Sequence, residues 1–147
     1  MLSKSDEEIL TERLRNWGRW AAVGRHARST IIYRMMVQAG EIKLEPSEPY
    51  RQIDIFDALL VDRAWRMLAQ LPARYWIAKW ALVAHYAFPW MPVRSFIEWV
   101  KKETRIQFGH EIRINSKDYD ILLETAKYQM FNLINQNAAK RLTVCDL

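Results

Sequence analysis

Three histidines, one cysteine and several carboxylates are the residues of this chain that could carry catalysis or bind a metal ion. His26, His85 and His110 lie far apart, and none falls in a zinc-binding pattern such as HExxH. Cys145 is the single cysteine, so neither an internal disulfide nor a thiolate zinc cage is expected. No glycine-rich phosphate loop or GxSxG motif occurs. We therefore expect no enzyme, no metal and no cofactor.

His85 and three aspartates have simpler structural explanations. His85 has apolar neighbours, which predicts a buried core histidine. Asp54, Asp57 and Asp62 cluster near the start of a predicted helix, where negative charge stabilises the helix dipole.

Basic charge is the second chemical feature. The chain of 147 residues has a net charge of +5 and a pI near 9.5, which favours polyanionic partners. No Asp or Glu lies between Arg13 and Gly40, and this run holds six arginines: Arg13, Arg15, Arg19, Arg25, Arg28 and Arg34. The run fits either a solvated helix face or a contact surface, and both interpretations stay open.

Helical periodicity in the N-terminal third predicts the elements that carry these arginines. Ser5 and Glu8 form a capping-box pattern, and we expect a helix from Asp6 to Val23 that stops at Gly24. Its core stripe is Leu10, Leu14, Trp17 and Ala21. A second, short helix is expected over Ser29–Gln38, ending at Gly40, followed by a linker over Glu41–Tyr50.

The remaining chain is predicted to be mostly helical. Helices should follow Asp54, Pro72 and Pro92, and end near Leu71, before Phe88 and near Glu103, respectively. Apolar residues then alternate with polar ones, which predicts a short β-hairpin or an extended loop; they are Ile106, Phe108, Ile112 and Ile114. Asn115 and Ser116 should cap a long last helix that frays from Gln136 onward.

These elements predict a mainly α fold, a helical bundle with three parts. They are an N-terminal helical segment and linker (1–50), a helical core (51–137) and a flexible tail (138–147). The polar N-terminus is no signal peptide, and the longest uncharged stretch, Trp80–Val93, is too short for a membrane span. We expect a protein of the reducing cytoplasm that contacts no membrane.

Seven tryptophans are expected to be mainly structural, because most fall at helical core spacing. Trp20 and Trp90 lie off the clearest stripes, so they are our candidates for a protein interface.

The order of the last three helices indicates a helix-turn-helix unit, with its supporting helix in front. In such units the N-terminal residues of the last helix contact bases, and nearby cations contact phosphates. The predicted base contacts are Ser116, Lys117 and Asp120, and the predicted phosphate contacts are Arg94, Lys101, Lys102 and Arg113. Carboxylates among them would weaken the prediction if they break up the basic surface: Glu98, Glu103 and Glu111.

Four stretches also resemble a known family. They are LRNWGRWAA (Leu14–Ala22), DALLVDRAWRML (Asp57–Leu68), LPARYWIAKWALVAHYAF (Leu71–Phe88) and DYDILLETAKYQMFNLI (Asp118–Ile134). In this order they resemble the antitermination protein Q family of lambdoid phages, of the phage 21 type, whose helix-turn-helix is akin to region 4 of bacterial sigma factors. One departure concerns the turn of three or four residues in such units, because about twelve residues, Thr104–Asn115, separate the predicted helices here.

The resemblance implies a transcription antitermination factor made by a phage and acting in the host bacterial cytoplasm. It implies binding to double-stranded DNA near a late promoter, and to host RNA polymerase with or without a sigma factor. On this view the N-terminal helix would contact polymerase or nascent nucleic acid, through Arg15, Trp17, Arg19, Trp20, Arg25 and Arg28. Two alternatives stay open: an operator-binding regulator, and a small helical protein that binds a host protein without DNA.

Overall fold

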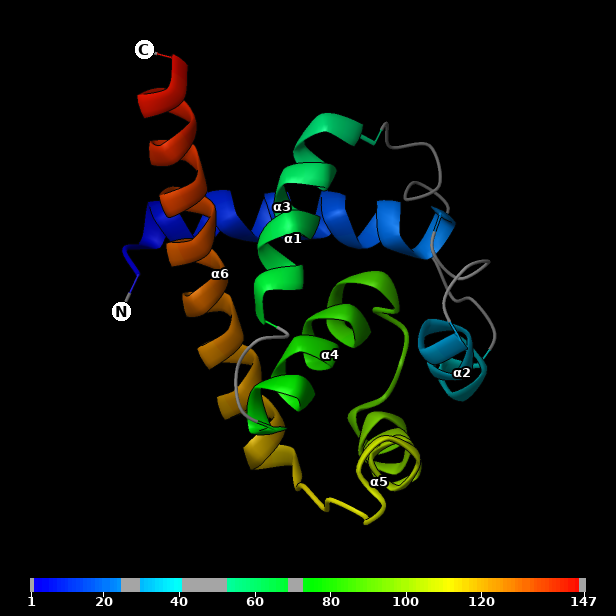
Figure 1. Cartoon of the computed structure of the whole chain (residues 1–147). Coiled ribbons are helices and arrows are strands. Elements are labelled where there is room, and N and C mark those ends of the chain that lie inside the picture. Colours follow the sequence, from blue (N-terminus) through cyan, green and yellow to red (C-terminus); the bar gives the residue numbers. More distant parts are fainter. Residues whose placement is uncertain (1, 25–29, 41–52, 69–72, 146–147) are drawn as a thin grey trace.

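In a computed structural model, six α-helices make up the regular structure of the described part of the chain (Figure 1). The structure describes residues 2–24, 30–40, 53–68 and 73–145, with the backbone alone at 23, 24, 30, 73, 74 and 137–145. The helices are α1 (Lys4–Gly24), α2 (Thr30–Ala39), α3 (Ile55–Met67), α4 (Ala73–Ala87), α5 (Val93–Phe108) and α6 (Ser116–Cys145). No strand occurs within these ranges, so the predicted mainly α fold is confirmed. The expected linker over 41–50 and the helix boundary at Leu71 and Pro72 lie outside the described residues.

The helix ends follow from local hydrogen bonds. Asp54 caps α3, since its carboxylate accepts from the backbone N–H of Asp57 at 3.1 Å. At the start of α6, Asn115 and Asp118 accept from each other's backbone N–H at 2.8 and 3.0 Å. The predicted cap of α1 is wrong by two positions. Ser3, not Ser5, accepts from the backbone N–H of Asp6 at 3.2 Å, so α1 begins at Lys4.

The predicted β-hairpin is wrong, and the alternative of an extended loop holds for 110–115 alone. Helix α5 continues past Glu103 to Phe108, and ends where Gly109 adopts a φ of 80°. The alternating apolar pattern predicted a hairpin wrongly because its first residues belong to α5 and its last residues to the connection after it. Ile106 is exposed on the last turns of α5, whereas Ile112 is half-buried on the connection, where its N–H donates to Thr104 Oγ1 at 2.9 Å.

Helix α6 is longer than expected, because it passes Gln136 and reaches Cys145. Figure 1 shows α6 running along one side of the molecule and crossing α1 near the N-terminus. There Lys127 Nζ lies 3.3 Å from a carboxylate oxygen of Glu7. The start of α1 and the middle of α6 are therefore joined by an ion pair.

Helix α1 is fixed to α3 and α4 by contacts between residues of the motifs quoted above. Trp17 is fully buried, and its indole N–H donates to Asp62 at 3.1 Å. Asp62 is thus a buried partner in mid-helix, so its expected role at the helix dipole is wrong. Gly18 faces the backbone of Tyr86 so closely that a Cβ would overlap its carbonyl. The absence of a side chain lets α1 and α4 touch.

The core is continuous through α1 to α6, and aromatic rings run through its centre. Trp80 lies in contact with Trp65, Trp76 and Trp99, at centroid distances of 5.2, 6.2 and 6.0 Å. The expectation that most tryptophans are structural is confirmed for these four side chains. His85, by contrast, is exposed, so the prediction of a core histidine is wrong. Its neighbour Tyr86 takes the buried position.

Helix α2 packs on α5 and is held there by an ion pair whose carboxylate is buried and whose guanidinium is partly exposed. Arg34 forms a fork with Glu103, with N–O distances of 2.8 and 2.6 Å. The Glu103 carboxylate is 1% exposed and also accepts from Gln107 at 3.1 Å. At the other end of α2, the Trp90 indole donates to the carbonyl of Gly40 at 3.4 Å. The short helix predicted over Ser29–Gln38 is therefore confirmed, with a defined docking site on α5.

Candidate nucleic-acid interface

Helices α4, α5 and α6 have the order of a helix-turn-helix unit behind a supporting helix. Figure 1 views α5 almost along its axis and α6 from the side, so the two helices cross at a steep angle. The connection between them is seven residues, 109–115, rather than the twelve expected, because α5 is longer than predicted. The departure from a turn of three or four residues is correspondingly smaller.

The N-terminal half of α6 has one buried and one exposed face. Tyr119 packs edge-on against Phe96, with ring centroids 5.3 Å apart, and burial raises the pKa of Tyr119 to about 12. The predicted base contacts are all exposed: Lys117 lies opposite Tyr119, whereas Ser116 and Asp120 lie on the flank between the two faces. Ile121 and Glu124 continue the exposed face toward the C-terminus. The start of α6 therefore presents a polar ridge of mixed charge, which a DNA groove could accept.

The four predicted phosphate contacts lie on two sides of α5. Arg113, on the connection, is exposed and lies within four residues of Lys117. Lys102 faces α2, because its ammonium donates to Gln38 at 3.2 Å. Arg94 is exposed at the first turn of α5, about 16 Å along the helix axis from the last turn. Lys101 is half-buried and pairs with Glu98 at 3.0 Å. The structure thus groups Arg113 with Lys117 and separates both from Lys102.

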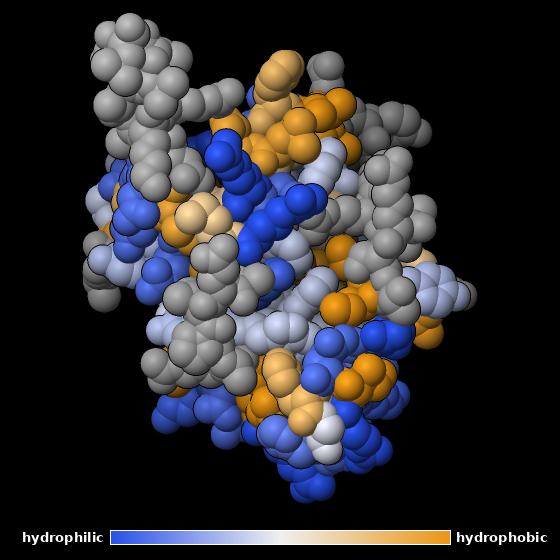
Figure 2. Space-filling model, in the orientation of Figure 1, coloured by the Kyte–Doolittle hydropathy of each residue, from blue (hydrophilic) through white to orange (hydrophobic). Residues whose placement is uncertain are grey.

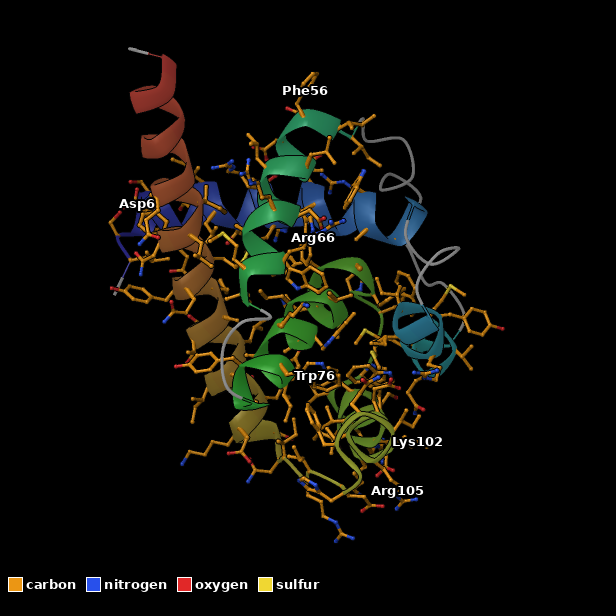
Figure 3. The ribbon with its side chains drawn as sticks, viewed as in Figure 1. Asp6, Phe56, Arg66, Trp76, Lys102 and Arg105 are labelled. Carbon is orange, nitrogen blue, oxygen red and sulfur yellow. The ribbon has the colours of Figure 1, made fainter. Side chains whose placement is uncertain are left out.

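Arg105 is a cation that sequence reasoning missed. It lies on the last turn of α5, and its side chain is 66% exposed (Figure 3). A helix that ends at Glu103, as the sequence pattern predicts, leaves Arg105 outside the predicted helix-turn-helix. With the helix extended to Phe108, the spacing of Arg94, Lys101 and Arg105 would have placed all three on one helical stripe.

The three acids that could break up the basic surface differ in their effect. Glu103 is withdrawn from the surface and satisfied by Arg34, and this hydrogen bond raises the pKa of the Arg34 guanidinium. Glu111 pairs with Arg105 and lies 3.5 Å from Arg113, so it partly neutralises the connection. Lys102, Arg94 and Lys117 form no ion pair with any described carboxylate. Glu98 is exposed and pairs with Lys101 at 3.0 Å. The basic surface is therefore interrupted at Glu98 and at Glu111.

The predicted contact set on α1 is divided by the structure. Arg15 is exposed and pairs with Glu12 at 2.8 Å, while Arg19 and Trp20 are half-buried. Trp17 is 0% exposed, and a side chain without accessible surface cannot contact a partner directly. It is therefore removed from the set. Arg25 and Arg28 lie outside the described residues.

Trp90, an interface candidate, is half-buried over Phe88, with ring centroids 5.6 Å apart. Its indole N–H is directed to Gly40, so Trp90 contributes to the docking of α2.

Within the described residues, no three His, Cys, Asp or Glu side chains gather in a group that could hold a metal ion. In the same part of the chain, no helix is both long and apolar enough to span a bilayer.

Comparison with known proteins finds similarity in fold rather than in sequence. No protein-family model matches the chain, and no curated protein sequence matches it significantly. The fold is similar to a solved structure described as transcription antitermination factor Q21 in complex with Q21-binding-element DNA. The TM-score is 0.56 at 18% identity, and the match covers 97% of this chain and 98% of that one. The resemblance noted from the motifs is thereby supported at the level of the fold.

Proposed function

We propose that this protein is a DNA-binding transcription antitermination factor of phage origin. It binds double-stranded DNA near a late promoter and acts on the host RNA polymerase, which then passes terminators. The observation that carries the proposal is the end-to-end fold shared with an antitermination factor solved on its DNA element. The proposed activity is binding, without a catalytic step.

The surface around the start of α6 supports DNA as a partner. Lys117 is exposed on the first turn of α6, and the exposed Arg113 and Arg105 meet at Glu111 on the connection that leads into this turn. Arginine and lysine side chains in this arrangement can bind phosphates, while Ser116 and Asp120 can hydrogen-bond to base edges. Helix α6 is held to the core by Tyr119 and Leu123, both buried, so this surface is rigid before DNA binds.

A binding assay tests the DNA part of the proposal. Duplexes tiled across late-promoter regions of lambdoid phages are titrated with the full chain at low and moderate salt. We expect one duplex to bind more tightly than a scrambled duplex of equal length, by about a thousandfold or more. Equal, weak binding to all duplexes would contradict a specific site. Absent binding at low salt would favour the protein that binds a host protein without DNA.

A terminator-readthrough assay tests the antitermination part. Purified bacterial RNA polymerase transcribes a template that carries the bound element, a promoter and a downstream terminator. We expect readthrough to rise on adding the protein, and to stay at its basal value on a template with a scrambled element. A change in initiation with unchanged readthrough would instead identify an operator-binding regulator.

A further inference from the structure

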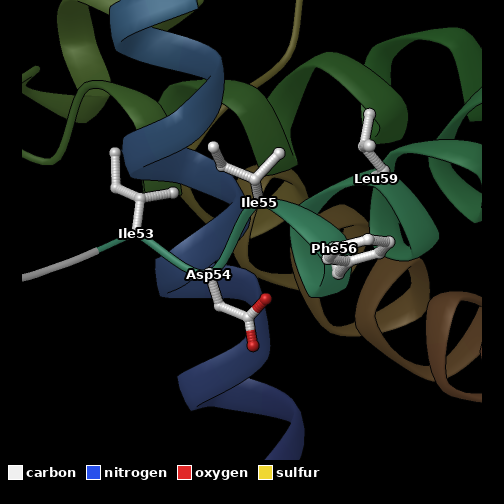
Figure 4. A pocket seen from close by; sticks show the side chains of 5 residues that line it. All are labelled: Ile53, Asp54, Ile55, Phe56 and Leu59. Atoms are coloured by element: carbon white, nitrogen blue, oxygen red, sulfur yellow. The ribbon is translucent and has the colours of Figure 1, made fainter.

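The first turns of α3 expose an unusual group of apolar side chains. Ile55, Phe56 and Leu59 are 59%, 84% and 51% exposed, and Ile53 beside them is half-buried. Single exposed apolar residues are ordinary on a soluble protein, but a contiguous group marks a binding surface. These side chains line a shallow pocket, and Figure 4 shows Ile53, Ile55 and Leu59 pointing to one side of the chain.

The exposed group is held in place from behind by α1. The backbone carbonyl of Asp54 accepts from the Asn16 side chain at 2.8 Å, and its N–H donates back at 2.8 Å. One turn on, Asp57 pairs with Arg13 at 2.8 Å. In Figure 4 the Asp54 side chain points away from the apolar side, toward α1. The start of α3 is therefore anchored, and its apolar residues are preorganised on the outer face.

Two arginines continue the same face of α3. Phe56, Leu59, Arg63 and Arg66 follow one another at helical spacing, and all four are exposed. Arg66 is 70% exposed and uses its Nε for Asp62, while Arg63 has no described carboxylate within ion-pair distance. Figure 2 shows a hydrophobic region over the first turns of α3, with strongly hydrophilic side chains directly below it. Figure 3 labels Phe56 and Arg66 along the helix. We call this face, Ile55, Phe56, Leu59, Arg63 and Arg66, the α3 stripe.

We propose that the α3 stripe binds an amphipathic helix of a partner protein that carries carboxylates next to its apolar residues. An apolar surface at helical spacing accepts leucine-like anchors, and exposed guanidinium groups bind carboxylates. The aliphatic half of the stripe offers a nucleic acid neither positive charge nor a side-chain hydrogen-bond donor. A second copy of this chain that docked by the same face would bring only apolar and arginine side chains to it.

The position of the stripe makes the proposal independent of the proposed function. In Figure 1 the first turn of α3 lies at the opposite end of the molecule from the connection between α5 and α6. A helix bound to the stripe would therefore leave the candidate nucleic-acid interface free.

A titration followed by methyl NMR tests this inference on the full chain. The probe is a synthetic amphipathic helix with leucines every three or four residues and glutamates on the flank; a matched peptide carries lysines in place of the glutamates. We expect saturable shifts of the Ile55 and Leu59 methyl signals with the glutamate peptide. The Ile121 methyl, 58% exposed on α6, should not shift. Equal shifts at Ile121, equal binding of the lysine peptide, or no saturable shift would overturn the proposal.

Two variants distinguish the contributions of the apolar and the charged residues of the α3 stripe to peptide binding. Phe56→Ala should weaken the glutamate peptide about tenfold, and Arg63→Glu should weaken it while strengthening the lysine peptide. Both positions are exposed, so the variants should unfold at the wild-type midpoint, and both should keep wild-type DNA binding. Ile121→Ser is the matched control and should bind the glutamate peptide as the wild type does. Unchanged affinity in both α3 variants, or concentration-dependent shifts without peptide that Phe56→Ala abolishes, would overturn the proposal.

Discussion

The indole N–H of Trp17 donates to a carboxylate oxygen of Asp62 at 3.1 Å, between two side chains that are 0% and 3% exposed. One belongs to the tryptophan–glycine motif of α1 and the other to the aspartate–alanine motif of α3. Two motifs separated by 45 positions are thus the two halves of one helix crossing. Their residue types follow from how α1 and α3 pack.

Removing either half of this pair should destabilise the fold. Trp17→Phe or Asp62→Ala leaves a buried polar partner without its hydrogen bond, so each should lower the free energy of unfolding by about 1–3 kcal/mol. Asp57→Ala is the matched control, because that aspartate is partly exposed and its pair with Arg13 is worth about 0–1 kcal/mol. Urea unfolding measures the midpoints at constant m value. Equal costs for the two aspartates would contradict the pairing.

Gly18→Ala should be more costly than its size suggests. The new methyl would overlap the Tyr86 carbonyl, so α1 and α4 must separate, at a cost of about 1–3 kcal/mol. Gly40→Ala serves as control, since a Cβ there meets nothing within 4 Å and only the positive φ opposes it, at about 1 kcal/mol. Thermal or urea unfolding of both variants gives the comparison. A smaller loss at Gly18 than at Gly40 would show that the close approach is unimportant.

Breaking the fork between Arg34 and Glu103 should release α2 selectively. In Glu103→Ala the guanidinium loses its buried partner. Helix α2 is then held by its buried residues Ile32, Met35 and Ala39 and by two longer hydrogen bonds at its C-terminal end, 3.2 Å to Gln38 and 3.4 Å to Gly40. Hydrogen exchange of the α2 amides should accelerate about tenfold or more, while α1 and α4 exchange as in the wild type. Glu98→Ala, which removes an exposed ion pair on the same helix, should change neither. Uniform acceleration across all helices would instead indicate global destabilisation.

His85 should make stability depend on pH in the acidic range. Although the His85 side chain is exposed at the surface, desolvation by the neighbouring core, together with the positive charges of Lys127 and Arg15, lowers its pKa below the ordinary value. The unfolded chain therefore binds the proton more readily. The stability that neutral His85 contributes is present above pH about 6.5, and it is lost as the pH falls through the pKa of His85 in the folded state. In His85→Gln the free energy of unfolding should fall less steeply between neutral and mildly acidic pH, and an unchanged slope would assign the dependence to other groups.

Lys117 should contribute one phosphate contact. The logarithm of the DNA association constant falls linearly with the logarithm of salt concentration, and Lys117→Ala should reduce the slope by about one unit. Arg113→Ala should also reduce the slope, but by less, because Glu111 lies 3.5 Å from the Arg113 guanidinium. Lys4→Ala, an equally exposed lysine at the start of α1, is the control and should leave the slope unchanged. If Lys4→Ala and Lys117→Ala have the same effect, the interface lies elsewhere.

Periodicity predicted the helices well where core residues repeat, and failed where the pattern crosses a helix end. Leu10, Leu14 and Ala21 were assigned to the core from spacing, and all three are buried. The end of α5 was missed because alternation around Gly109 resembles a hairpin, although the residues before the glycine are helical. Because α5 was predicted to end too early, Arg105 was left out of the candidate site and the turn between α5 and α6 was predicted too long.

Tertiary pairing was beyond sequence reasoning. Glu103 looks like a surface acid in the run Lys101–Glu103, yet it is buried because Arg34, 69 positions away, reaches it. Spacing placed Trp17 in the core stripe of its helix, which is confirmed, whereas the resemblance also placed it in a contact set; its hydrogen-bond partner, Asp62, is in another helix. For the predicted base contacts at Ser116, Lys117 and Asp120, the sequence identified exposed residues on the first turns of α6, and their contacts with DNA stay a prediction.

Helix α6 is a single element of 30 residues, so it measures about 45 Å from end to end. One residue inserted beyond Met130 would rotate everything after it by about 100° without moving the turn that carries Lys117. The length of α6 therefore fixes both the distance between its two ends and the rotation of one end relative to the other about the helix axis. A partner that binds the C-terminal end of α6 while the N-terminal end is bound elsewhere must approach from one direction around the helix axis. That direction is set by the number of residues between the two ends.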